Sequence, residues 1–234
     1  MLKACLNGGR GRDAHPAVPV TPAELAADAA RCAALGVGAV HVHPRDHDGA
    51  ESLRPTVIAE AVAAIRAARP GLRIGVSTGE WIEPDPAARV AAVRSWTVLP
   101  DFASVNAHEP GAEAVAVALR DRGVAVEVGL WTPDAVGAYR DWRVPVERIL
   151  VECMAEKPAE ALTDADAILD ALDPDGPPRL LHAEGGAVWP VLVEAVRRGL
   201  DTRIGFEDTV HLPDGSPAAD NAALVAAATA LGAG

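Results

Sequence analysis

The sequence predicts a single-domain α/β protein, a (β/α)8 TIM barrel that spans residues 1–234. Eight short β-branched runs, each closed by turn residues, are each followed by an alanine-rich stretch with helical spacing. The length of 234 residues is close to the roughly 250 that such a barrel needs. Strict alternation implies parallel strands with right-handed crossovers, and eight of them can close into a barrel. An open doubly wound sheet built from the same units is the alternative.

The strands are predicted from runs rich in Val, Ile and Leu that end in Gly, Pro, Asn or Asp. Hydrophobic residues make up 50% of the chain and aromatic residues only 3%, which predicts an aliphatic core of buried parallel strands. In chain order the predicted strands cover 2–7, 37–43, 72–78, 101–106, 124–130, 148–154, 178–184 and 202–207.

The helices are predicted from the segments between these runs. At the first helix, Thr21 can cap the N-terminus, Pro22 fits the first turn, and the Glu24 carboxylate is favoured by the helix dipole. Gly36 and Gly123 are placed to end helices just before the next strand. In chain order the predicted helices cover 22–35, 56–68, 85–95, 111–122, 133–141, 163–172, 188–199 and 217–231.

The overall charge and composition exclude several classes of partner. A net charge of -12 without a compensating Lys/Arg run would repel a phosphate backbone, so we expect no nucleic-acid partner. No apolar run approaches the roughly 18 residues of a membrane span, and the first residues lack the core of a signal peptide. We therefore expect a cytoplasmic protein without membrane contact. The three cysteines, Cys5, Cys32 and Cys153, are odd in number and widely spaced, which argues against a disulfide framework.

Two histidines end the second predicted strand. His41 and His43 are separated by one residue, so on a strand their side chains share one face, and Pro44 ends the strand directly after them. Two imidazoles that project together can bind zinc if a third ligand is supplied and one position stays open. The alternative is that both merely hydrogen-bond to backbone groups.

Adjacent carboxylates end the eighth predicted strand. Glu207 can complete a site with the two histidines, because all strand ends converge on one mouth of a barrel. Asp208, with Arg203 four residues before Glu207, is expected to stay ionised and to act as a base. The alternative is a solvated turn in which Asp208 caps the next segment.

Two further polar residues occur in apolar strands. Glu152 would be costly inside a barrel unless it is paired, which makes it a candidate pocket residue. His182, at the end of the seventh predicted strand, points either into the mouth or sideways into the packing.

These residues occur within a set of motifs that resembles the β-keto acid cleavage enzymes, the family typified by 3-keto-5-aminohexanoate cleavage enzyme. The resemblance covers nearly the whole chain. It rests on VPVTP at 18–22, HVHPRDHDG at 41–49, STG at 77–79, SVN at 104–106, VEV at 126–128 and RIGFED at 203–208.

The resemblance implies a zinc-dependent barrel that cleaves a small β-keto acid with acetyl-CoA to give acetoacetate and a new acyl-CoA. It implies Zn2+ or another divalent metal on His41, His43 and Glu207. It implies catalytic roles for Asp208, Arg203, Glu127, Ser77 and Ser104. Together with the positions of these residues in or after the predicted strands, it implies substrate contacts for Arg10, Asn7, Asn106, Glu152 and His182. A homo-oligomer is also expected.

The chain departs from the family pattern in three places. Arg10 stands where the aminohexanoate enzyme has a glutamate suited to the substrate's ammonium, so the charge preference should invert. Arg10 could instead form an ion pair with Glu80 or Asp13. The segment after the fourth strand is shorter than in the family, and the family's C-terminal extension is missing, so the chain resembles a shortened member. Both differences weaken the expectation of CoA binding and of the family's oligomer.

Two other functions remain as alternatives. A zinc-dependent barrel hydrolase also uses a His-x-His pair, but usually on the first strand with further histidines on the fifth and sixth, where this chain offers Glu127 and Glu152. A barrel that binds a metal or ligand without catalysis is the second alternative, because a fold alone does not guarantee chemistry. The base candidate Asp208 argues against it.

Overall fold

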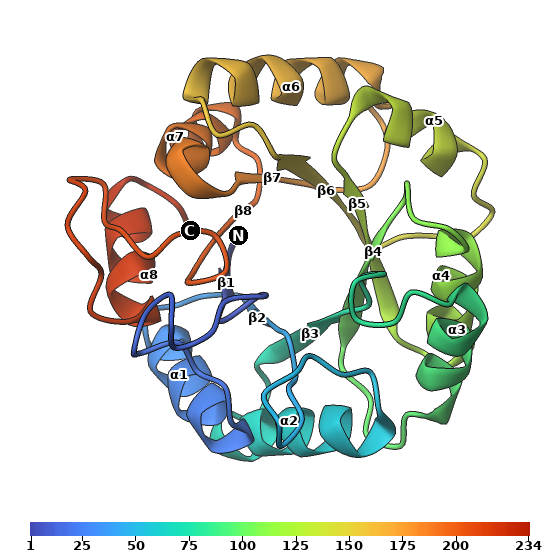
Figure 1. Ribbon diagram of the computed structural model, residues 1–234. Helices are drawn as coiled ribbons and strands as arrows, with labels where there is room; N and C mark the ends of the chain where they lie inside the picture. The colour runs from blue at the N-terminus through green and yellow to red at the C-terminus, as the bar shows by residue number, and fades with distance from the viewer.

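A computed structural model describes residues 1–234 as eight parallel strands that alternate with helices. Figure 1 looks along the axis of this arrangement, with the strands as an inner ring and the helices as an outer ring. The strands are β1 (Leu2–Cys5), β2 (Ala39–Val42), β3 (Arg73–Ser77), β4 (Phe102–Asn106), β5 (Ala125–Leu130), β6 (Arg148–Cys153), β7 (Arg179–Ala183) and β8 (Thr202–Ile204). The helices are α1 (Pro22–Ala34), α2 (Pro55–Ala68), α3 (Pro86–Ser95), α4 (Ala112–Asp121), α5 (Pro133–Arg140), α6 (Pro158–Ala171), a 3-10 turn η1 (Gly185–Ala187), α7 (Val188–Arg198) and α8 (Asn221–Ala230).

The sheet curves round until its two outer strands meet. Its strand order is β7-β6-β5-β4-β3-β2-β1-β8, with every neighbouring pair parallel. At the seam the Leu181 N–H donates to the Asp201 carbonyl at 2.9 Å, and the Asp201 N–H donates to the Arg179 carbonyl at 3.1 Å. The predicted (β/α)8 barrel is therefore confirmed in a nearly closed form, and the open doubly wound sheet is excluded.

The first helix begins where its capping residues predict. The Glu24 N–H donates to the Thr21 hydroxyl at 3.3 Å, and the Thr21 N–H donates to the Glu24 carboxylate at 3.0 Å. This reciprocal capping box satisfies two N–H groups that the helix leaves free, with Pro22 in the first turn.

Two helices begin away from their predicted positions. Helix α6 starts at Pro158 instead of residue 163, because a proline is well suited to the first helical turn. Helix α8 starts at Asn221 instead of residue 217, because the Asp220 carboxylate accepts from the Ala223 N–H at 2.8 Å and caps the helix there. Both errors are errors of boundary, and the elements themselves were predicted.

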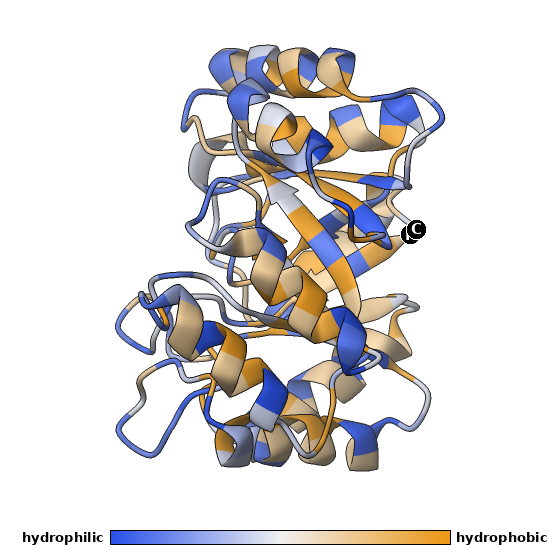
Figure 2. Ribbon diagram, turned by 90° about the vertical axis from the view of Figure 1, so that its right-hand side faces the viewer, coloured by the Kyte–Doolittle hydropathy of each residue, from blue (hydrophilic) through white to orange (hydrophobic).

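The core is aliphatic and lies between the strand ring and the helices. Figure 2 shows strands that are mostly hydrophobic, covered by helices that mix hydrophobic and hydrophilic residues. Cys5, Cys32 and Cys153 are buried free thiols, as the sequence predicted. None of the helices has the length and apolar character needed to cross a bilayer.

Charged side chains fill the N-terminal end of the barrel, which we call the barrel floor and define as Lys3, Glu127, Arg148 and Asp201. Lys3 and Glu127 are 1% and 0% exposed and form an ion pair with each other. Arg148 donates to Glu127 at 2.8 Å and to Asp201 at 3.0 Å, and the Met1 amine donates to the other Asp201 oxygen at 2.7 Å. Each of these carboxylate oxygens therefore has a cationic donor.

Candidate active site at the C-terminal end of the barrel

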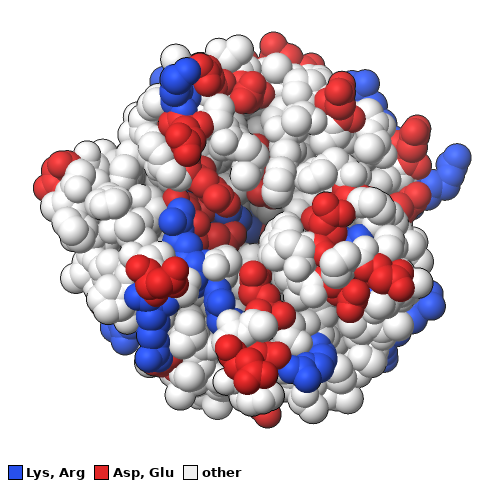
Figure 3. Space-filling view, in the orientation of Figure 1, with Lys and Arg blue, Asp and Glu red and all other residues white.

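A cavity of about 480 Å³ opens at the C-terminal end of the strands and is lined mainly by polar residues. Figure 3 shows the corresponding hollow at the centre of the face, with acidic and basic side chains around it. The C-terminal strand ends are where barrel enzymes place their active sites. Of the predicted site residues, those that line it are Arg10, His41, His43, Ser77, Ser104, Asn106, Glu152, Arg203 and Glu207.

The two histidines project from the end of β2 into this cavity. His41 and His43 are 3% and 4% exposed, and their Nε2 atoms are 3.2 Å apart. Two nitrogen ligands of a tetrahedral zinc, each about 2.05 Å from the ion, lie about 3.3 Å apart. Burial, followed by the neighbouring His43, lowers the pKa of His41 well below its ordinary value, so His41 is held neutral. A neutral imidazole is the form that binds a metal.

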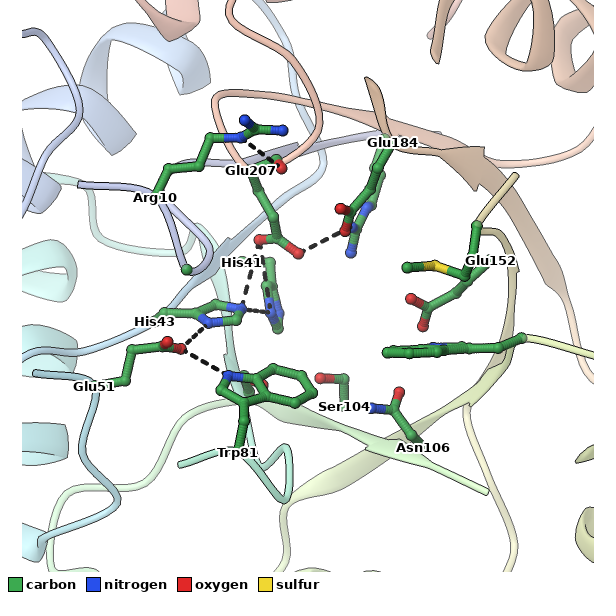
Figure 4. A pocket seen from close by; sticks show the side chains of 15 residues that line it. Arg10, His41, His43, Glu51, Trp81, Ser104, Asn106, Glu152, Glu184 and Glu207 are labelled. Atoms are coloured by element: carbon green, nitrogen blue, oxygen red, sulfur yellow. Dashed lines mark hydrogen bonds and ion pairs between the residues drawn. The ribbon is translucent and has the colours of Figure 1, made fainter. Parts of the chain in front are cut away.

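Glu207 faces the two imidazoles. Its Oε2 lies 3.6 Å from His43 Nε2 and 4.0 Å from His41 Nε2, and this buried oxygen has no hydrogen-bond partner (Figure 4). The other oxygen forms an ion pair with Arg203 Nη2 at 2.9 Å. A buried carboxylate oxygen without a partner is costly unless a cation is bound there. The ligand atoms of these three residues lie within 4.8 Å of one another, and this donor set fits one divalent ion.

Glu207 reaches this position from a turn and not from the strand that was predicted. Strand β8 ends at Ile204, and a Cβ on Gly205 would lie 1.9 Å from the Cys5 carbonyl oxygen. The absence of a side chain at Gly205 therefore lets the chain cross close to β1, where the Glu207 N–H donates to the same carbonyl at 3.2 Å. The prediction of a strand to residue 207 was wrong, although the position at the mouth was right.

A second carboxylate orients His43. Glu51, in the loop after β2, is hydrogen-bonded to His43 Nδ1 and accepts from the Trp81 indole N–H at 3.2 Å. Burial raises the pKa of Glu51, but the hydrogen bond and charge of His43 outweigh it and leave that pKa below the ordinary value. A carboxylate on Nδ1 fixes the tautomer that leaves Nε2 free for a metal. Glu51 was not predicted as a site residue, and the only hint of it in the sequence is its position eight residues after His43.

The Asn7 side chain holds the backbone of His43 in place. Its side-chain amide donates to the His43 carbonyl at 2.9 Å and accepts from the His43 N–H at 2.9 Å. Asn7 is completely buried and does not line the cavity. Asn7 therefore lies outside the cavity where a substrate contact is predicted, and both ends of its amide join β1 to the end of β2.

Asp208 lies behind Glu207, out of contact with solvent. Its Oδ1 accepts a hydrogen bond from Arg203 Nε at 3.0 Å and forms an ion pair with Nη2 at 2.8 Å, while its Oδ2 has no partner. Burial raises the pKa of Asp208 to about 8, even though Arg203 lowers it. The sequence predicts that Arg203 keeps this carboxylate ionised, but loss of solvation has the larger effect on its pKa.

His182 and Glu152 lie side by side near Asp208. His182 is 2% exposed, neither ring nitrogen has a hydrogen-bond partner, and burial lowers its pKa well below the ordinary value. Its Nδ1 is 3.9 Å from Asp208 and its Nε2 is 3.6 Å from Glu152. Burial raises the pKa of Glu152 to about 7. Glu152 lines the cavity, whereas His182 is buried behind it.

Glu127, like Asn7, His182 and Asp208, does not line the cavity. It belongs to the barrel floor, where Lys3 and Arg148 bind its two oxygens. Its position within β5 points it into the barrel below the mouth, one layer away from the expected catalytic position. The sequence alone could not separate these layers, because side chains of alternate residues point into the same barrel interior.

Arg10 lines the cavity and has no ion-pair partner. Its guanidinium donates to the backbone carbonyls of Glu207 at 3.2 Å and Asp208 at 3.3 Å. It forms no bridge to Glu80 or Asp13, which was the alternative to a substrate contact. Besides Glu51, the cavity is lined by five residues that the sequence did not predict as site residues: Gly9, Trp81, Trp131, Met154 and Glu184.

The fold and the site together define a class: a TIM-barrel protein with a candidate His/His/Glu metal site at the C-terminal mouth of the barrel. A family profile described as BKACE, beta-keto acid cleavage enzyme, matches residues 1–233. The chain belongs to the beta-keto acid cleavage enzyme family.

Several solved structures share this fold at low sequence identity. A 3-dehydroquinate dehydratase from Geobacillus kaustophilus HTA426 has a TM-score of 0.65 at 12% identity, covering 99% of this chain and 90% of that one. A phosphoribosyl anthranilate isomerase from Thermus thermophilus has a TM-score of 0.53 at 17% identity, covering 98% of each chain. An L-Ala-D/L-Glu epimerase has a TM-score of 0.50 at 17% identity, covering 87% of this chain, which spans 56% of that enzyme. These similarities show the fold alone.

Proposed function

We propose that this protein cleaves a small β-keto acid in a reaction that depends on a divalent metal, with zinc held by His41, His43 and Glu207. The partner substrate is acetyl-CoA, and the products are acetoacetate and a new acyl-CoA. Family membership implies the cleavage of β-keto acids. Zinc, the acetyl-CoA partner and a homo-oligomeric state are parts of this proposal that follow the family resemblance.

The observation that carries the proposal is the unpaired oxygen of Glu207 beside two converging imidazoles. Its Oε2 lies 3.6 Å and 4.0 Å from the two Nε2 atoms, buried and without a hydrogen bond. When bound there, a divalent ion acts as a Lewis acid that polarises the keto oxygen and lowers the cost of enolate charge.

Asp208 and Arg203 supply the proton transfer in this proposal. Arg203 forms ion pairs with both Glu207 and Asp208 and donates one hydrogen bond to Asp208, so a single side chain holds the ligand and the base together. The free Oδ2 of Asp208 accepts the acidic proton next to the keto group. A base is most effective when its pKa lies near the working pH, and burial shifts the pKa of Asp208 upward in that direction.

The remaining predicted residues bind substrate or support the site. Ser77 and Ser104 line the cavity at neighbouring positions of β3 and β4 and offer hydroxyl groups to the substrate. Glu127 acts indirectly, because it neutralises Lys3 beneath the mouth. We assign His182 a supporting role in the packing between Glu152 and Asp208.

Arg10 sets the charge preference. Its guanidinium has no carboxylate partner in the protein, so it offers a fork to an anionic or neutral polar group and repels an ammonium. Kinetic series with amino-terminated and carboxylate-terminated β-keto acids on wild type and Arg10→Glu measure this preference. We expect wild type to favour the carboxylate series and the variant to lose that preference. A wild-type preference for the amino series, or no change in the variant, would remove Arg10 from substrate recognition.

The reaction is tested with zinc-loaded protein and a panel of β-keto acids, with and without acetyl-CoA. Mass spectrometry follows the acids and the thioesters. We expect acetoacetate and a new acyl-CoA only when acetyl-CoA is present. Cleavage by water without acetyl-CoA would favour a hydrolase, and no turnover across the panel would favour a binding protein.

A further inference from the structure

Two acceptor oxygens approach each other above Gly129 of β5, on one wall of the cavity. A Cβ on Gly129 would lie 2.4 Å from Asn106 Oδ1 and 2.5 Å from Glu152 Oε1. Gly129 is not among the glycines with positive φ, so its backbone conformation would accept an alanine. The lack of a side chain at Gly129 therefore leaves a gap between the two oxygens that any other residue would fill.

The amide of Asn106 is held so that its oxygen faces this space. Its Nδ2 donates to Glu109 Oε1 at 2.7 Å, and Arg89 binds the other Glu109 oxygen. Arg89 and Glu109 are 0% and 4% exposed, so this support is rigidly enclosed. Because the amide nitrogen is turned toward Glu109, the amide oxygen of Asn106 faces the gap as an acceptor.

Glu152 supplies the second acceptor and has no donor of its own. No hydrogen bond reaches its carboxylate, and the His182 Nε2 atom lies 3.6 Å away, which is too long for one. Burial keeps His182 neutral by lowering its pKa. Figure 4 shows Glu152 and Asn106 on the side of the cavity opposite Glu51 and His43. Two mostly buried acceptors that share a gap are satisfied only when a donor enters it.

We propose that Asn106, Glu152 and Gly129 form a subsite for a hydroxyl group carried by the β-keto acid at its end away from His41 and His43. This inference rests on the proposed function, because it names the substrate class of the same cavity. The hydroxyl donates to Asn106 Oδ1. A hydroxyl also accepts, so it can pair with Glu152 when that carboxyl is protonated.

Other end groups fit this subsite less well. A carboxylate would face two acceptors, and a methyl group would leave both without a partner. An ammonium would share a cavity with the Arg10 and Arg203 guanidinium groups. Since burial raises the pKa of Glu152 to about 7, Glu152 is not a full negative charge at neutral pH to balance that ammonium.

The test compares 3-oxo acids of five to seven carbons that end in a hydroxyl, a methyl or an ammonium group. Calorimetry measures their binding to zinc-loaded protein without acetyl-CoA, so the readout does not require turnover. We expect wild type to bind the hydroxyl compound about 3- to 10-fold more tightly than the methyl compound, the range of one hydrogen bond. Equal binding of the two, or tightest binding of the ammonium compound, would overturn the proposal.

Two variants test the residues. Gly129→Ala should remove the hydroxyl preference because its methyl group fills the gap. Glu152→Gln should remove it as well, because the new amide N–H donates to Asn106 within the protein. The matched control is Gly137→Ala in α5, where a Cβ meets nothing within 4 Å, and it should keep the preference. A preference that survives both site variants would refute the subsite.

The outcome separates this inference from the reaction itself. Cleavage of β-keto acids without any hydroxyl preference would sink the subsite and leave the proposed reaction intact. A hydroxyl preference that depends on Gly129, in a protein without turnover, would support the subsite and count against the reaction.

Discussion

The barrel floor and the barrel mouth both bury several charged side chains, but only the floor pairs all of its carboxylate oxygens. In the floor, Glu127 and Asp201 each have both oxygens bound by cationic groups. At the mouth, Glu207 Oε2, Asp208 Oδ2 and both ring nitrogens of His182 are buried without a hydrogen bond.

This difference distinguishes structural charges from functional ones. A buried polar group without a partner costs free energy, so a fold keeps one where something else is bound or transferred. A fully paired network is structural instead, because removing any member leaves an uncompensated buried charge and destabilises the fold. Residue type alone therefore does not mark the site, since Glu127 and Glu207 are both buried glutamates inside one barrel.

The largest expected effect is the loss of the metal from the mouth. The double variant His41→Ala/His43→Ala should fall from about one bound zinc per chain to none, because only the Glu207 carboxylate would remain. Elemental analysis of purified protein measures this. The matched control is His47→Ala, in the exposed Asp46/His47/Asp48 cluster, which should keep its zinc. The opposite pattern would place the metal in that exposed cluster.

In the floor, Glu127→Gln should lower the free energy of unfolding by about 3–5 kcal/mol, because Lys3 and Arg148 lose their shared counter-charge. Urea denaturation of the metal-free protein measures this, and zinc content per folded chain should not change. The same substitution in an exposed pair, Glu160→Gln beside Lys157, should cost less than about 1 kcal/mol. Equal costs would mean that the floor network adds no more stability than a surface pair.

At the mouth, Asp208→Asn should reduce turnover by about 100-fold or more while zinc stays bound, because the variant cannot accept a proton. Steady-state kinetics on the best acid of the panel measures the loss. Asp214→Asn, on the exposed loop that follows, is the control and should be unaffected. A variant that keeps more than about a tenth of wild-type activity would show that Asp208 is not the base.

The smallest effect is expected at Glu51, which touches the metal site through His43. Glu51→Gln should weaken zinc binding by about 10- to 100-fold, because the carboxylate that fixes the His43 tautomer is lost. Competition with a chelator measures the affinity. The control is Glu184→Gln, because Glu184 also lines the cavity but is not hydrogen-bonded to either histidine. This variant should change the zinc affinity less. Equal losses would reduce the role of Glu51 to the general charge of the cavity.

The sequence by itself determined the barrel, the order of its elements and three metal-ligand candidates. It could do so because hydrophobic runs and helical spacing are local, and because a barrel brings all C-terminal strand ends to one mouth. The His-x-His spacing fixed the shared face of His41 and His43 in the same local way. The motifs at 41–49 and 203–208 identified the family.

Only the tertiary structure decided which of the polar residues are free to act. Asn7 and Glu127 have the same residue types as active-site groups, yet their partners, His43, Lys3 and Arg148, lie far away in the sequence. The pairing of Glu51 with Trp81 also depends on loops that the sequence does not place relative to each other. Burial and pairing are properties of three-dimensional neighbours, so a residue's pKa and its free lone pairs cannot be read from its local sequence.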